Sequence, residues 1–265
     1  MKRFPLPALL ALMIAVLSCN GTAPVADVKP TATLVIPSDT PAPTDTPMPT
    51  DTPPPPPTAT PDTAATAAVL ATQSASNVMT ELDTWLGSSD VPYKDGHLVW
   101  QQTETVKIDM TGPQDDNYRE IGENLTAGNF IFKSDVTWEA SGVLICGLIF
   151  RSERHLIGGK QYQFYFYRLS GLPAYFIDVY EFGEFKNTIT DERFSKDLDV
   201  SNGGTNKFML VAQDNQFNVY INGNRQSRFF DDSKQRAEGY LAFLAWQESG
   251  TGSCQFENSW VWSLD

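Results

Sequence analysis

From Pro92 to Asp265 the chain is a succession of short runs in which large apolar or β-branched side chains alternate with polar ones. Gly, Asn and Asp residues separate the runs, and no long helical period lies between them. Many short strands with turn signals and no intervening helices are typical of an antiparallel β-sandwich. We therefore expect an all-β domain with strands over residues 97–110, 129–139, 143–151, 161–169, 174–181, 207–213, 217–221, 239–247 and 255–264.

Alternation along a strand also predicts which side chains face the core, because successive residues point to opposite faces of a sheet. In the run 143–151 the predicted core face comprises Leu144, Cys146, Leu148 and Phe150, and Arg151 falls on the opposite face. Asn222-Gly223 follows the run 217–221 and suits a two-residue type I′ turn, since both residue types tolerate positive φ.

The amino terminus has the pattern of a secretory signal peptide. Met1-Lys2-Arg3 supplies the positive charge, and an apolar run from Leu6 to Leu17 follows. This run is shorter than the ~20 apolar residues that span a bilayer. We therefore assign residues 1–18 to a signal peptide that is removed on export.

The signal peptide ends in Val16-Leu17-Ser18-Cys19, which resembles the lipobox of bacterial lipoproteins. The resemblance implies cleavage before Cys19 and acylation of its thiol and of the new amino terminus. Two or more acyl chains anchor a protein stably. We expect an extracytoplasmic protein that contacts the cell membrane only through this lipid, the alternative being an ordinary signal peptide with an incidental cysteine.

Composition divides the rest of the chain into three parts. Residues 19–62 are rich in Pro and Thr and cannot bury enough apolar surface to order themselves, so we expect a disordered, semi-rigid linker. Residues 63–87 are rich in Ala and place apolar side chains at three- and four-residue intervals, which predicts a short helix. This helix is expected to pack on the following domain, residues 88–265, with self-association as the alternative.

Five short motifs in this domain resemble, in their order, those of concanavalin A-like (LamG-like) jelly-roll domains from bacterial surface proteins. The resemblance implies a two-sheet antiparallel jelly roll. Most of these residues form turns and core, so it describes fold rather than activity. The motifs are Tyr93-Lys94-Asp95-Gly96, Gly147-Leu148-Ile149-Phe150-Arg151, Asn206-Lys207-Phe208-Met209-Leu210-Val211, Val219-Tyr220-Ile221-Asn222-Gly223 and Phe256-Glu257-Asn258.

The same resemblance bears on the cysteines. Lipidation of Cys19 leaves Cys146 and Cys254 in a compartment that permits disulfides. The family pattern places these two in an early and a final strand, which often lie side by side in jelly rolls. It implies a Cys146–Cys254 disulfide, the alternative being two separate buried thiols.

The sequence carries no recognisable catalytic motif. It has two histidines, His97 and His155, and no metal-ligand or nucleophile spacing. Related 3-keto-disaccharide hydrolase domains follow the Gly147 strand with a Tyr-Glu-x-Gln pattern, and the acid and glutamine of that pattern are absent from Tyr162-Gln163-Phe164-Tyr165. We therefore expect no enzyme and no cofactor, with a structural Ca²⁺ left open.

Charge and aromatic content guide the choice of partner. The net charge of −13, without a basic patch, argues against nucleic acid. Sugar sites combine flat aromatic rings with polar groups that fix orientation. We expect a carbohydrate-binding module for a cell-surface or extracellular glycan, the alternatives being an envelope scaffold and, more distantly, a hydrolase of the type above. The candidate contacts, all expected on strand faces opposite the core, are Arg151, Tyr165, Tyr167, Asp178, Tyr180 and Trp246.

Overall fold

The computed structural model describes residues 63–169, 171–190 and 193–265. The expected signal peptide, the lipidation site Cys19 and the Pro/Thr-rich linker lie outside the described residues. In the described part the chain forms one long helix, α1 (Thr63–Leu86), a short 3-10 turn, η1 (Tyr93–Asp95), and fifteen strands. No helix among the described residues is long and apolar enough to cross a membrane.

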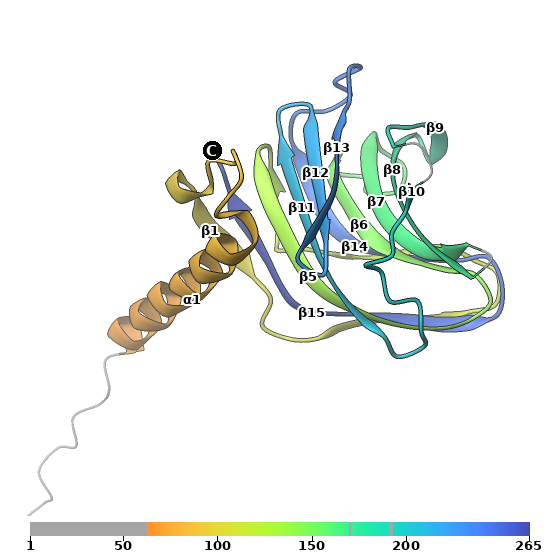
Figure 1. The fold of residues 1–265 in the computed structure, drawn as a ribbon, viewed down its shortest axis with the longest axis horizontal. Helices are drawn as coiled ribbons and strands as arrows, with labels where there is room; N and C mark the ends of the chain where they lie inside the picture. The colour runs from red at the N-terminus through yellow and green to blue at the C-terminus, as the bar shows by residue number, and fades with distance from the viewer. Residues whose placement is uncertain (1–62, 170, 191–192) are drawn as a thin grey trace, which may run out of the picture. The chain divides into compact units, whose positions relative to one another are not determined.

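The strands form two antiparallel sheets that face each other (Figure 1). In sheet A, β2 pairs with β15 beside the main path. The main path runs in the order β1 (His97–Gln101), β15 (Thr251–Ser263), β5 (Phe130–Ser141), β11 (Thr205–Gln213), β12 (Gln216–Ile221) and β13 (Asn224–Phe230), and β2 is Val106–Thr111.

Sheet B forms the second layer. Its path is β10 (Arg193–Phe194), β8 (Leu172–Glu181), β7 (Gln161–Leu169), β6 (Leu144–Ser152), β14 (Gly239–Gln247) and β3 (Gln114–Glu120). Two short strands pair beside this path, namely β9 (Glu184–Thr188) with β8 and β4 (Thr126–Ala127) with β14. The two packed antiparallel sheets confirm the jelly-roll sandwich that the strand pattern predicted.

The hairpin between β12 and β13 has the geometry that its sequence predicted. Ile221 pairs with Asn224, so the turn contains two residues. Asn222 and Gly223 both adopt positive φ, 49° and 85°. The turn therefore has the backbone that matches the twist of the flanking strands.

The core between the sheets is aromatic and is crossed by one disulfide. Phe166 stacks on Phe208 with ring centroids 3.9 Å apart, and Phe243 stacks on Phe256 at 4.5 Å. Cys146 of β6 and Cys254 of β15 are bonded, with their Cα atoms 5.7 Å apart. The implied pairing is thus present, but the two strands belong to different sheets, so the bridge ties the layers together through the interior.

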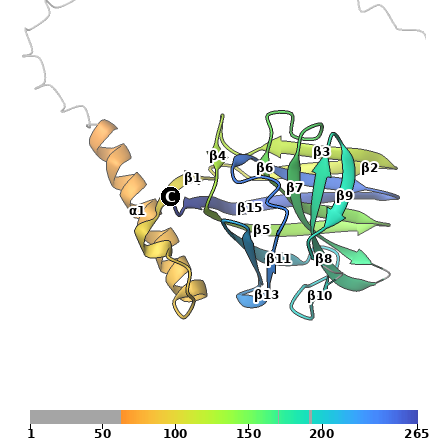
Figure 2. The same ribbon diagram turned by 90° about the horizontal axis from the view of Figure 1, so that it is seen from above.

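Helix α1 covers part of the outer face of sheet A, beside β1 and β15 (Figures 1 and 2). Val78, Leu82 and Leu86 are buried there among apolar side chains of β5, β11 and β15. Two polar contacts hold the same end of the helix: Trp260 Nε1 donates to Glu81 Oε2 at 3.0 Å, and Tyr93 Oη donates to Asp83 Oδ1 at 2.7 Å. Nearer its amino terminus, residues 66–73 of α1 are exposed, including Val69 and Leu70.

Candidate functional site

The outer face of sheet B, which points away from the core, carries most of the residues predicted as ligand contacts. On β7, Phe164 and Phe166 lie in the core, so Tyr165 and Tyr167 point outward. On β8, Ile177 lies in the core, and Asp178 therefore faces outward. Strand alternation predicted this arrangement.

A depression of about 540 Å³ lies on this face, and we call it the sheet B depression. It brings together three of the predicted residues, Tyr165, Tyr180 and Trp246, from three different strands. Tyr167 and Asp178 lie beside it and do not line it. The lining residues are Ile145, Ile157, Gln163, Tyr165, Tyr180, Gly183, Leu244 and Trp246.

A glycine lets β6 and β7 approach each other closely. Gly147 of β6 pairs with Leu244 of β14 on one side and with Tyr165 of β7 on the other. A Cβ atom at Gly147 would lie 2.3 Å from the carbonyl oxygen of Phe164 and 2.7 Å from Cβ of Tyr165. Packing therefore requires glycine here, because β7 occupies the place that a side chain would take.

The tyrosines are held by ring contacts. Phe176 of β8 stacks on Tyr165 and on Tyr167, with centroids 5.6 Å apart in both pairs. Tyr180 makes an edge contact with Phe185 of β9 at 6.0 Å. Such pairs contribute about 0.5–1.5 kcal/mol each beyond their buried area, so the rings are held in place before any ligand arrives.

A buried carboxylate stands beside the depression. Asp178 is 4 % exposed, and the Tyr165 hydroxyl donates a hydrogen bond to its Oδ2. Burial raises the pKa of Asp178, and the polar contacts with Tyr165 and Thr188 offset only part of that rise. Burial, followed by the contact with Asp178, also raises the pKa of Tyr165, so this phenol remains a donor at neutral pH.

Gln163 is a site residue that the sequence analysis missed. It lines the depression, is 3 % exposed, and pairs across the strands with Asp178. Within the described part of the chain, its Nε2 and the Oδ1 of Asp178 have no hydrogen-bond partner. Buried polar atoms in folded proteins are normally satisfied, so these two atoms are exceptions, and both are closed off from solvent in the structure.

Arg151 is not a surface contact, and its predicted orientation is wrong. The side chain is 1 % exposed. Its guanidinium donates to the carbonyl oxygens of Gly128, Asp214 and Arg236 at 2.6–3.3 Å and lies over the ring of Phe217, 5.5 Å from the centroid. Arg151 ties together the loops at one end of the sandwich.

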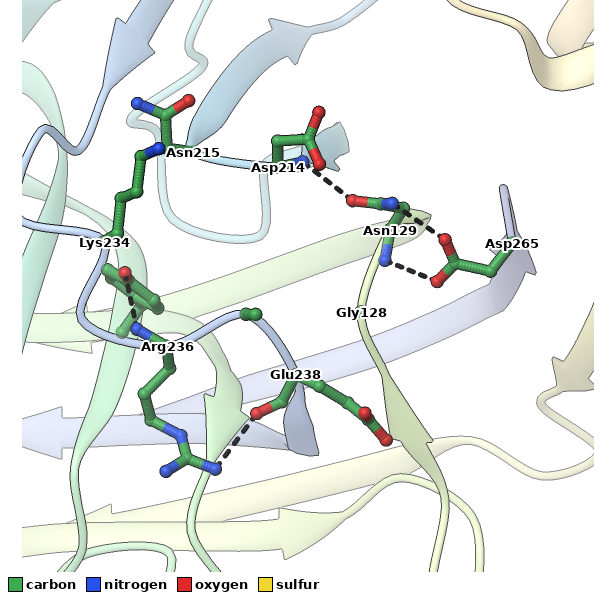
Figure 3. Close-up of a pocket in the computed structure, with 10 residues that line it drawn as sticks. Gly128, Asn129, Asp214, Asn215, Lys234, Arg236, Glu238 and Asp265 are labelled. Carbon is green, nitrogen blue, oxygen red and sulfur yellow. Dashed lines mark hydrogen bonds between the residues drawn. The ribbon is translucent and has the colours of Figure 1, made fainter.

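A second cavity, of about 530 Å³, lies at that end, between the loops that Arg151 joins (Figure 3). Several of the polar groups that line it bond to one another. Asn129 donates through its backbone and side chain to Asp265 and accepts from the amide of Asp214, while Arg236 donates to the Glu238 carbonyl at 3.0 Å. These bonds indicate a structural role in joining the loops.

The described residues form no cluster typical of a metal site, and the sheet B depression lacks the acid pair of a hydrolase. Among the described residues, no three His, Cys, Asp or Glu side chains are grouped to hold a metal ion. The described residues that line the sheet B depression include no pair of carboxylates, which glycosidases use as acid and base or nucleophile.

Fold and site together define a jelly-roll β-sandwich with an aromatic, polar-edged depression on one sheet. No protein-family profile matches the chain, and neither does the sequence of any curated protein. Among solved structures, the chain is similar to the carbohydrate-binding module CBM66 from Bacillus subtilis, with 16 % identity, a TM-score of 0.45, and coverage of 61 % of this chain and 94 % of that one.

Two further structures show the same level of similarity. The Bacillus licheniformis β-glucanase has 10 % identity and a TM-score of 0.42, with 62 % of this chain and 82 % of that one covered. The Caenorhabditis elegans galectin LEC-6 has 9 % identity and a TM-score of 0.36, with 56 % and 95 % covered.

Proposed function

We propose that this chain is a non-catalytic carbohydrate-binding protein and that the sheet B depression is its glycan site. One observation carries the proposal: aromatic side chains from three strands line one depression on the outer face of sheet B, together with the polar side chain of Gln163. Aromatic faces pack on the apolar faces of pyranose rings, and polar groups at the same place supply orientation.

The proposal is for binding rather than catalysis, because the depression lacks the acid pair that glycoside cleavage needs. Asp178 has no second carboxylate near it among the described residues that line the depression, and one of its oxygens already accepts a hydrogen bond from Tyr165. A shallow and open site on a sheet face suits recognition of a polysaccharide, since a chain can lie across it without threading into a tunnel.

Replacing Trp246 with alanine tests this site. Trp246 is partly buried and lies at the end of the depression opposite Tyr180, so its loss removes a stacking surface and leaves the inter-sheet core intact. We expect glycan affinity to fall by at least about tenfold, since truncation of an aromatic anchor in an interface costs ~2 kcal/mol or more. The measurement is binding to a glycan array followed by titration of each positive glycan.

The matched control is Phe230→Ala, which removes an exposed aromatic from β13 of the other sheet. This variant should bind like the parent, and both variants should melt within a few degrees of it. If the parent binds no glycan, or if Trp246→Ala binds every positive glycan as tightly as the parent, carbohydrate recognition at this site is excluded.

We further propose that the protein is anchored outside the cytoplasm by lipid on Cys19, so that the linker carries the domain away from the membrane. The support is the order of charge, apolar run, small residue and cysteine at the amino terminus. Cys19→Ala should move the protein from the detergent-extracted membrane fraction to the soluble fraction. Equal fractionation of the parent and of Cys19→Ala into the soluble phase would refute the anchor.

A further inference from the structure

We propose, resting on the function above, that the glycan site continues past the sheet B depression onto the hairpin of β8 and β9. Phe182 and Phe185 form a second stacking surface there. The ligand is then an internal stretch of a polysaccharide chain, several sugar units long, and the depression holds only part of it. This assigns two further contact residues and a ligand class, an extended chain rather than a chain end or a short oligosaccharide.

The turn between β8 and β9 holds a phenylalanine in a backbone conformation that such residues rarely adopt. Glu181 pairs with Glu184, so the turn has two residues. These are Phe182 and Gly183, and both adopt positive φ, 56° and 77°. The equivalent turn between β12 and β13 uses Asn-Gly, the pair that tolerates this backbone. A bulky residue at such a φ is an outlier, and strain of this kind concentrates at functional sites.

Burial does not offset the strain at this turn. Phe182 is 71 % exposed, more than any other large apolar side chain in the described part of the chain. Phe185 is also exposed, and it lies on the outer face of sheet B because it pairs with Tyr180, which lines the depression. Single exposed apolar side chains are common, but a group of them beside a depression indicates a binding surface.

The two phenylalanines continue the aromatic lining of the depression. Phe185 makes an edge contact with Tyr180 at 6.0 Å, and Gly183 of the turn itself lines the depression. We call the side chains that lead from the depression to the hairpin the aromatic row. None of them is buried, so a ligand on the outer face can reach each one. The members are Trp246 of β14, Tyr165 of β7, Tyr180 of β8, Phe185 of β9 and Phe182 of the turn.

The aromatic row is too long for a single sugar unit. It runs obliquely across β14, β6, β7, β8 and β9, which are successive strands of sheet B, with β9 at its edge (Figure 1). Neighbouring strands lie ~4.8 Å apart, so the row covers roughly 19 Å across the strands. A chain lying over it can place several of its units on aromatic rings, and each contact adds to the affinity.

A chain-like ligand fits the aromatic row better than a protein partner does. On β9 the row is one side chain wide, because the other residues of that strand are polar or charged. The acids of the hairpin are paired, Glu181 with Lys160 at 2.8 Å and Glu184 with Lys186 at 3.0 Å. A stable protein interface needs roughly 20–30 residues a side. A narrow apolar row with polar, charge-balanced margins suits pyranose rings, which have apolar faces and hydroxyl groups at their edges.

The test compares ligands that differ in length. The full chain is titrated with cello-, laminari-, manno-, xylo- and galacto-oligosaccharides, each from the disaccharide to the octasaccharide. The same length series is prepared from any other polysaccharide that binds on the array. In each series that binds, affinity should rise by at least about tenfold from the trisaccharide to the hexasaccharide, because only the longer members reach the hairpin.

Variants of the hairpin separate binding from folding. Phe182→Asn and Phe185→Ala should each lower affinity for the hexasaccharide and longer members by at least about fivefold, the effect of losing one aromatic contact. Phe182→Asn should leave the trisaccharide affinity unchanged and should melt at or above the parental temperature, because asparagine tolerates positive φ. The matched control is Phe230→Ala on β13, since Phe230 and Phe185 are both 54 % exposed. It should keep parental affinity for every length.

The outcomes distinguish this inference from the proposed function. If the trisaccharide binds as tightly as the octasaccharide, or if Phe182→Asn and Phe185→Ala both bind the long members like the parent, the extension is wrong and glycan binding at the depression stands. If the parent self-associates and Phe182→Asn abolishes this without changing affinity for the long members, the hairpin is an interface between copies instead. If no oligosaccharide and no glycan on the array binds the parent, the proposed function fails and the extension fails with it.

Discussion

We expect replacement of both Cys146 and Cys254 with alanine to lower the free energy of unfolding by about 4–5 kcal/mol. The bridge closes a loop with a sequence separation of 108 residues, and a cross-link of that length removes a large amount of entropy from the unfolded chain. The bridge also joins β6 of sheet B to β15 of sheet A, so its removal takes away the covalent link between the two layers in the core. A loss of this size is comparable to a large part of the stability of an ordinary domain.

The measurement is urea unfolding of the parent and of the double variant, each with and without reductant. The reduced parent should unfold near the midpoint of the double variant, and reductant should not move the midpoint of the variant. Cys146→Ala alone should fall in the same range, since either change removes the bridge. The prediction fails if the unreduced parent, once unfolded, presents Cys146 and Cys254 as titratable thiols.

The pattern of alternation was enough to predict the faces of the long strands in sheet B. Phe164 and Phe166 pack inward and Tyr165 outward, because a period of two leaves only one way to bury the more apolar set. The same reasoning failed at Arg151, where the alternation of inward and outward side chains is interrupted. Arg151 has φ of +48°, and the pairing between β6 and β14 shifts register at this point, so the side chain turns toward the loops at the end of the sandwich.

Strands that contribute little apolar surface could not be found from the sequence. β3 reads Gln-Asp-Asp-Asn-Tyr-Arg-Glu, and every residue of β9 is exposed, so neither carries an alternating apolar signal. These segments become strands because they pair with neighbouring strands of the sheet. The predicted run 97–110 is likewise two strands, β1 and β2, which pair separately with β15.

The missing site residue has a similar explanation. Gln163 sits between two aromatic residues and looks like an ordinary outward polar side chain. Its place in the site comes from the register that sets it opposite Asp178 and from its position in the lining of the depression. Strand register and burial carry that information, and neither can be read from one sequence.

Arg151→Met is expected to lower the free energy of unfolding by about 3–5 kcal/mol and to leave the glycan site unchanged. The guanidinium is the shared donor for the carbonyl oxygens of Gly128, Asp214 and Arg236, which belong to three different loops. Methionine has a similar length and keeps the contact with the ring of Phe217, but it donates nothing.

Two opposing effects decide the size of this loss. Removing a buried charge recovers its desolvation cost, and replacing both partners of a buried pair with apolar groups is often harmless. Here the partners are backbone carbonyls, which no substitution removes, and each buried one left unpaired costs about 1–3 kcal/mol. The unpaired carbonyls therefore outweigh the recovered charge.

Thermal and urea unfolding measure the loss, with Arg154→Met as the control. Arg154 is largely exposed and lies 4.0 Å from Glu120, so its replacement should change the free energy of unfolding by less than about 1 kcal/mol. At temperatures where both variants are folded, both should bind the parental glycan with parental affinity. Loss of a buried donor that three loops share must lower stability. If Arg151→Met melts like the parent but no longer binds the glycan, Arg151 is a binding residue and the structural role assigned to it is wrong.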